Sequence, residues 1–176
     1  MSSTKEPRKF IRGELTTVLF GQALVASFFA LILAWNNSRE PIILNYAIII
    51  YIFWVSSVGL GAMKIVKLSK ISNPVLAGIL SICGAILGYV FHWFWLYFFS
   101  GGACGGLFDF IINRLDQGIV IETIRRGSSR SYLTEVGREA LLIVWSLEPI
   151  LYLYSAYLGA TFQADKALSK RRNPWE

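Results

Sequence analysis

Hydrophobic residues are concentrated in four long blocks that are separated by polar segments. The blocks run about from Leu15 to Trp35, from Ile42 to Met63, from Pro74 to Phe99 and from Glu139 to Phe162. A helix needs roughly 20 apolar residues to cross a hydrocarbon core about 30 Å thick, and each block reaches that length. The pattern therefore predicts an all-α fold, namely a polytopic transmembrane bundle of about four helices.

The blocks divide the chain into one membrane domain and two basic tails. Residues 1–14 form a basic amino-terminal tail, residues 15–162 the membrane domain and residues 163–176 a basic carboxyl-terminal tail. We expect both tails to be disordered. Asn73-Pro74 predicts the start of the third helix, because proline is favoured in the first turn of a helix.

The loop 100–138 is predicted to carry structure of its own. Its apolar residues recur at helical spacing and are Leu107, Phe108, Ile111, Ile112 and Leu115. The intervening polar residues are Asp109, Asn113, Arg114 and Asp116. This pattern predicts an amphipathic helix in the membrane interface, and a short helix folded onto the end of the bundle is the alternative. The β-branched run Ile119 to Ile121 predicts a brief strand, and Arg125 to Arg130 a polar turn.

Composition excludes an ordinary soluble domain. Apolar residues make up 55% of the chain and charged residues only 16%, whereas soluble domains carry about 25% charged residues. Lys and Arg at the ends of membrane spans, where they contact anionic lipid, account for the net charge of +6. We therefore expect the lipid bilayer as a partner, and no nucleic acid.

The distribution of cations predicts the orientation. Four Lys or Arg residues lie in the amino-terminal tail, one in the first loop, three in the second, five in the third and four in the carboxyl-terminal tail. With a cytoplasmic amino terminus, eleven cations lie inside and six outside, as the positive-inside rule requires. A re-entrant third block, which would place the third loop inside, is the alternative.

Glu148 is the costliest residue in the predicted spans. An ionised carboxylate at the centre of a helix costs about 2.5–3.5 kcal/mol on insertion scales. Pro149 follows directly and is predicted to act as a helix hinge. Helical spacing places Trp145, Tyr152 and Ser155 on the side of Glu148. Glu148 is therefore either a proton or cation site beside a helix break, or a neutral carboxyl bonded within the bundle.

Small residues form stripes on three of the blocks. One face of the third block carries Ala77, Ser81, Gly84 and Gly88. One face of the first block carries Ala23, Ser27, Ala30 and Ala34, and one face of the fourth carries Ser155 and Gly159. Such stripes let helices pack closely in lipid. Packing within one chain is expected, and self-association stays open.

Other polar and aromatic residues receive structural predictions. His92, Trp93 and Trp95 lie near the end of a span, where we expect them at the membrane interface. Gln22 and Asn45 are predicted to hydrogen-bond between helices.

No motif indicates an enzyme, a cofactor or a metal site. The chain has no Gly-x-Ser-x-Gly, His-Glu-x-x-His or phosphate-binding loop. Cys83, Cys104 and a single histidine provide no ligand set for zinc.

Two stretches resemble small bacterial four-span membrane proteins with no assigned activity. They are Gly84-Ala-Ile-Leu-Gly-Tyr-Val-Phe-His-Trp93, and Gly118 followed by Gly137-Arg-Glu-Ala-Leu-Leu-Ile-Val-Trp-Ser-Leu-Glu148. Such proteins often have Ala after the glutamate, where this chain has Pro149. The resemblance implies a bacterial inner-membrane location and no particular chemistry.

Three functions follow as hypotheses. The first is a non-enzymatic membrane protein that acts by assembly, as a homo-oligomer or as a small subunit of a larger membrane complex. The second is a channel, pore or transporter component in which Glu148 lines an aqueous or proton path. The third is an enzyme acting on lipid at the interface, with the third loop as a lid.

Overall fold

Four long helices and a small cap make up the structure. The computed structural model describes residues 12–38, 42–102, 106–124 and 131–172. Its elements are α1 (Arg12–Asn37), β1 (Ile42–Ile43), α2 (Leu44–Ser69), α3 (Pro74–Phe99), α4 (Leu107–Gln117), β2 (Ile119–Ile124), β3 (Ser131–Val136) and α5 (Arg138–Arg172). Helices α1, α2, α3 and α5 are long and apolar enough to cross a membrane. The predicted all-α membrane bundle is confirmed.

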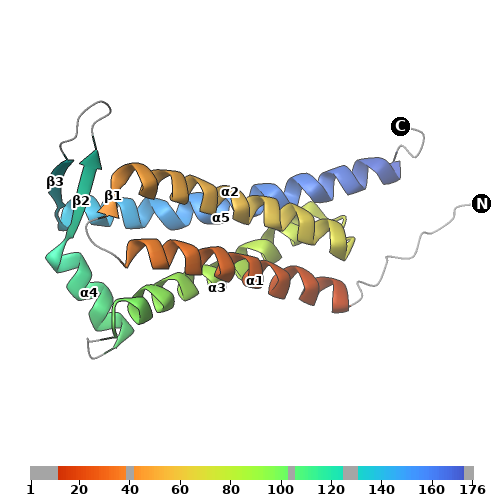
Figure 1. Cartoon of the computed structure of the whole chain (residues 1–176). Coiled ribbons are helices and arrows are strands. Elements are labelled where there is room, and N and C mark those ends of the chain that lie inside the picture. Colours follow the sequence, from red (N-terminus) through yellow and green to blue (C-terminus); the bar gives the residue numbers. More distant parts are fainter. Residues whose placement is uncertain (1–11, 39–41, 103–105, 125–130, 173–176) are drawn as a thin grey trace, which may run out of the picture.

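The long helices lie side by side (Figure 1). Helix α1 packs against α2 and α3, and α5 packs against the same two helices, so that α2 and α3 lie diagonally although they are consecutive in the chain. We call the end where α1 begins and α5 finishes the terminal end. The opposite end, which carries α4 and the strands, is the loop end. Helix α3 runs unbroken for 26 residues, or about 39 Å, which argues against the re-entrant alternative.

Helices α1 and α3 run parallel, and small residues form the contact between them. A Cβ atom on Gly84 would lie 2.6 Å from the carbonyl oxygen of Leu19 and 2.8 Å from Cβ of Gln22. One turn further along both helices, Gly88 faces Ala26. The small-residue stripe of the third block, with Ala77, Ser81, Gly84 and Gly88 all buried, therefore lies inside the chain.

Helices α2 and α5 form a second parallel pair. Gly59 faces both Ser155 and Gly159, and Ser155 Oγ donates a hydrogen bond of 2.7 Å to the carbonyl oxygen of Val55. Gln22 links the two pairs, since its Nε2 donates to the carbonyl oxygen of Val58 at 3.3 Å. The predicted interhelical role of Gln22 is confirmed, whereas the side chain of Asn45 lies outside the described residues.

Interlocked apolar side chains fill the terminal end of the bundle. We call this group the terminal apolar cluster, and its buried members are Val18, Ala62, Ile65, Val66, Ile71, Ala77, Ala160 and Ala164. Here Asn73 starts α3 as predicted, because its side chain accepts a hydrogen bond from the backbone N–H of Leu76 at 3.2 Å.

Helix α1 exceeds its predicted bounds by two or three residues at each end, and two other helices extend well past their predicted carboxyl ends. Helix α2 continues past Met63 to Ser69, and its exposed lysines Lys64 and Lys67 flank buried apolar residues. Helix α5 continues to Arg172. The expectation that residues 163–172 are disordered is therefore wrong, because helix-favouring residues carry the helix past the end of the hydrophobic block.

The loop end is built from α4 and a three-stranded sheet. Strand β2 pairs with β1 in parallel and with β3 in antiparallel orientation, so that the loops after α1 and α3 are joined. The brief strand predicted from Ile119 is confirmed. The predicted turn from Arg125 to Arg130 lies outside the described residues.

The buried face of α4 differs from the predicted one. Phe110 and Leu115 are buried, while Phe108 is 74% exposed. Phe110 packs edge-on against Tyr97 of α3, with ring centroids 5.6 Å apart. Helix α4 thus folds onto the end of the bundle, and it leaves Phe108 and Ile112 on the outside.

Replacing Gly88 by Ala is expected to destabilise the bundle by about 1–3 kcal/mol, because the added methyl group would collide with Cβ of Ala26 and force α1 away from α3. Unfolding in detergent, followed by circular dichroism, measures this change. Gly106→Ala is the control, because its Cβ would meet nothing within 4 Å. Equal stability of the two variants would contradict the packing described.

Candidate functional site

Glu148 lies deep inside the bundle. Its side chain is only 8% exposed. It stands ten residues after the start of α5 at Arg138, which is about 15 Å along the helix axis. The buried acidic residue that the sequence singles out therefore faces protein, at the level where Tyr51 of α2 donates a hydrogen bond to the Glu148 carbonyl oxygen at 3.2 Å.

A small cavity of about 50 Å³ opens beside Glu148. Residues from α1, α3, α4, α5 and β2 line it, and they are Asn37, His92, Trp93, Leu96, Arg114, Ile119, Trp145 and Glu148. The cavity brings together three ionisable side chains from three helices, at the loop end of the bundle. We call it the Glu148 cavity.

Arg114 is the ionisable member of this cavity that the sequence did not reveal. It is half-buried, and its Nη2 donates a hydrogen bond of 3.0 Å to the carbonyl oxygen of Asn37, the last residue of α1. The negative end of the α1 dipole favours a cation at this position. The amphipathic pattern of α4 assigned Arg114 to the polar outer side, and only the docking of α4 turns it inward.

An aromatic layer lies next to the Glu148 cavity, in contact with His92. Trp54 of α2 stacks on Tyr152 with ring centroids 4.3 Å apart, and it lies 5.5 Å from the ring of His92. Trp93 and Trp145 meet edge to face at 4.7 Å in the cavity wall. Stacked and edge-to-face pairs of this kind hold rings in fixed positions. Trp93 and Trp145 therefore form a rigid part of the cavity wall that they share with Glu148.

The interfacial assignment of His92 requires correction. His92 is 2% exposed, and its Nδ1 lies 3.5 Å from the carbonyl oxygen of Ala30. It faces the interior because it continues the stripe of Gly84 and Gly88, at a four-residue spacing. Trp95 is half-buried near the end of α3, where it stacks on Phe99.

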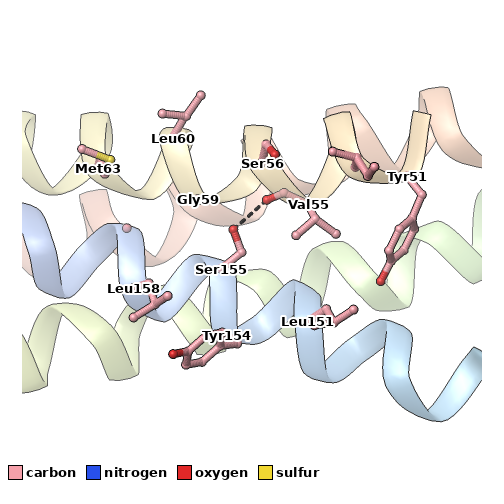
Figure 2. Close-up of a pocket in the computed structure, with 12 residues that line it drawn as sticks. Tyr51, Val55, Ser56, Gly59, Leu60, Met63, Leu151, Tyr154, Ser155 and Leu158 are labelled. Carbon is pink, nitrogen blue, oxygen red and sulfur yellow. Dashed lines mark hydrogen bonds between the residues drawn. The ribbon is translucent and has the colours of Figure 1, made fainter. Parts of the chain in front are cut away.

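The remaining predicted site residues are separated from the cavity. Ser155 lies about two turns beyond Glu148 and lines a groove of about 590 Å³ between α2 and α5, together with Gly59 and Tyr154 (Figure 2). The groove is apolar and open, as expected of a surface that contacts lipid chains. Pro149 lies inside α5, which is helical on both sides of it.

Among the described residues, no group of three or more His, Cys, Asp or Glu side chains could hold a metal ion. Cys83 is exposed on the outer face of α3, and Cys104 lies outside the described residues. Comparisons of the chain with protein families, with curated proteins and with solved structures gave no match. The geometry of the Glu148 cavity is therefore the basis for the function proposed below.

Arg114→Ala is expected to loosen α4, because it removes a charged hydrogen bond worth about 1.5–3 kcal/mol. Amide hydrogen exchange of residues 107–117 should become faster. The control is Arg138→Ala, whose ion pair with Asp116 at 3.1 Å is exposed and contributes about 0–1 kcal/mol. If both variants exchange alike, Arg114 does not anchor the helix.

Proposed function

We propose that this integral membrane protein is a channel or transporter component that binds a small cation, or a proton, at Glu148. The observation that carries the proposal is the convergence of Glu148, His92 and Arg114 on one cavity. Polar and ionisable groups at membrane depth are costly, and they commonly mark ion or proton pathways. Arg114 lines the same cavity and is held there by its hydrogen bond to the carbonyl oxygen of Asn37.

The size of the cavity supports a small ligand. Sites for organic ligands usually occupy about 300–1,000 Å³, whereas the Glu148 cavity holds about 50 Å³. One water molecule takes about 30 Å³ in the liquid. A water molecule, a hydrated proton or a bare ion fits, and a lipid head group does not. This argues against a lipid-acting enzyme whose site is the Glu148 cavity.

The hypothesis of function by assembly has lost its main support. It drew on the small-residue stripes, and these pack within the chain at Gly84, Gly88, Gly59 and Gly159. The outer surfaces of the long helices are apolar and suit contact with lipid. The groove between α2 and α5, which Ser56, Gly59, Ser155 and Gly159 help to line, is a surface where small residues still face outward.

We place the protein in the bacterial inner membrane with a cytoplasmic amino terminus, on the basis of the cation distribution and the resemblance given above. A reporter that is active only outside the cytoplasm should be active when it is inserted between β2 and β3. The same reporter should be inactive at the carboxyl terminus. The reverse pattern would invert the orientation.

Glu148→Gln is expected to lower proton or cation flux into liposomes at least about tenfold, a change of about 1.4 kcal/mol in the barrier. The amide has nearly the same size, but it neither ionises nor carries a proton. Flux is measured with an internal pH indicator under an imposed potential and with Na⁺ or K⁺ gradients.

Glu139→Gln provides the matched control, because Glu139 is exposed in the first turn of the same helix. Its flux should equal that of the wild type. Liposomes that stay tight with the wild-type protein, or equal flux for both variants, would contradict the proposal.

A further inference from the structure

Buried polar atoms continue from the Glu148 cavity toward the middle of the bundle. Among the described side chains of the four long helices, four buried polar atoms have no hydrogen-bond partner, and they are Trp54 Nε1, Tyr152 OH, Gln22 Oε1 and Ser81 Oγ. All four side chains are essentially inaccessible, at 0–1% exposure. We call these four residues the polar seam. They come from α2, α5, α1 and α3, so each helix of the bundle contributes one.

The members of the seam lie at successive depths. Trp54 stacks on Tyr152 and contacts the ring of His92, and Tyr152 comes one turn after Glu148 in α5. The Tyr152 hydroxyl points at Gly88, since a Cβ on that glycine would lie 2.9 Å from it. Gln22 faces Gly84, the next small residue along α3. Ser81 comes last, eleven residues before His92, or about 16 Å along the helix axis.

From these contacts we infer that the polar seam is a water-lined half-channel that carries protons between the Glu148 cavity and the middle of the membrane. An unpaired buried polar group is costly, and buried waters usually satisfy such groups. Gly84 and Gly88 add no side chain of their own beside Gln22 and Tyr152, where α3 packs on α1. This inference rests on the proposed function, and it names the proton as the species that moves.

The chemistry of the seam suits protons better than metal cations. The hydroxyls of Tyr152 and Ser81 can each donate one hydrogen bond while accepting another, and Gln22 Oε1 accepts. Trp54 Nε1 only donates, so it orients a water and carries no proton itself. A hydroxyl that takes a proton from the water on one side gives up its own proton to the water on the other side, and it then regains its first orientation by rotating about its C–O bond. The carboxyl group of Glu148 supplies or accepts the proton at the loop end, and at the far end the proton leaves when water enters the terminal apolar cluster. None of the four seam residues has a carboxylate group, so the seam offers no ring of negative charge to a bare metal cation.

Tyr157 of α5 packs on Gly78 of α3 near the terminal end. Apart from Tyr152 itself, the other titratable groups around the seam that the structure describes lie at its loop end. They are Glu148 of α5, His92 and Tyr89 of α3, Tyr51 of α2 and Arg114 of α4. Beyond Ser81 the interior is closed by the terminal apolar cluster, which includes Val18, Ile71 and Ala77. Hydrophobic constrictions gate by excluding water. The half-channel therefore opens from the loop end, and the terminal apolar cluster is its gate.

The inference is tested by removing single hydroxyl groups. Ser81→Ala and Tyr152→Phe each delete one oxygen and little volume, and proton flux into liposomes should fall about tenfold for each. Ser146→Ala and Tyr154→Phe are the matched controls, because both residues are exposed on the outer face of α5. Their flux should equal that of the wild type.

A third variant tests the gate. Ala77→Ser places a hydroxyl one turn beyond Ser81 within the terminal apolar cluster, and proton flux should rise about tenfold. If proton flux is unchanged in this variant, the terminal apolar cluster is not the gate of the half-channel. Detergent unfolding adds a second readout, because deleting an unpaired hydroxyl from a dry interior stabilises a protein. If Ser81→Ala and Tyr152→Phe both stabilise the bundle, the seam is dry and the inference is wrong.

The flux results also separate the inference from the function on which it rests. Flux that depends on Glu148 but is unchanged in Ser81→Ala and Tyr152→Phe overturns the half-channel alone. Wild-type liposomes that stay tight overturn both.

Discussion

The close approach of α1 and α3 is the contact on which the rest of the structure depends. In a bilayer, apolar surface gives helices no drive to associate, so contact area and packing decide which faces meet. Gly84 and Gly88 let the backbone of α3 touch α1, and the same four-residue step brings His92 to the carbonyl oxygen of Ala30. This parallel register also leaves room for the Tyr152 hydroxyl beside Gly88.

The two ends of the bundle have opposite characters. The terminal end is filled by the terminal apolar cluster, while the loop end holds the Glu148 cavity beneath α4 and the sheet. Helix α4 is drawn there by the exposed carbonyl at the end of α1, which binds Arg114. The pairing of β1 with β2 ties the first loop to the third. A bundle closed by apolar packing at one end and by charge at the other is polarised along the membrane normal.

Local features of the chain were predictable, because their causes lie within a few residues. The length of each hydrophobic block predicts a span, and Asn73-Pro74 predicts the start of α3. The free-energy cost of placing a carboxylate in lipid identified Glu148 as a candidate site residue from the sequence alone. His92 and Arg114 were misjudged because the contacts that place them lie far away in the chain. His92 meets a carbonyl 62 residues away and Arg114 one 77 residues away.

The sequence by itself determined the membrane class of this protein, the four spans, the amphipathic third loop and the one costly acid, since hydrophobic length and periodicity are local properties. Only the tertiary structure decided that the small-residue stripes are used within the chain. It also decided that Glu148 shares a cavity with His92 and Arg114, and that four orphaned polar atoms line up below it. The register between packed helices determines which of these side chains come together. That register depends on backbone contacts between helices, so it cannot be predicted from any one segment.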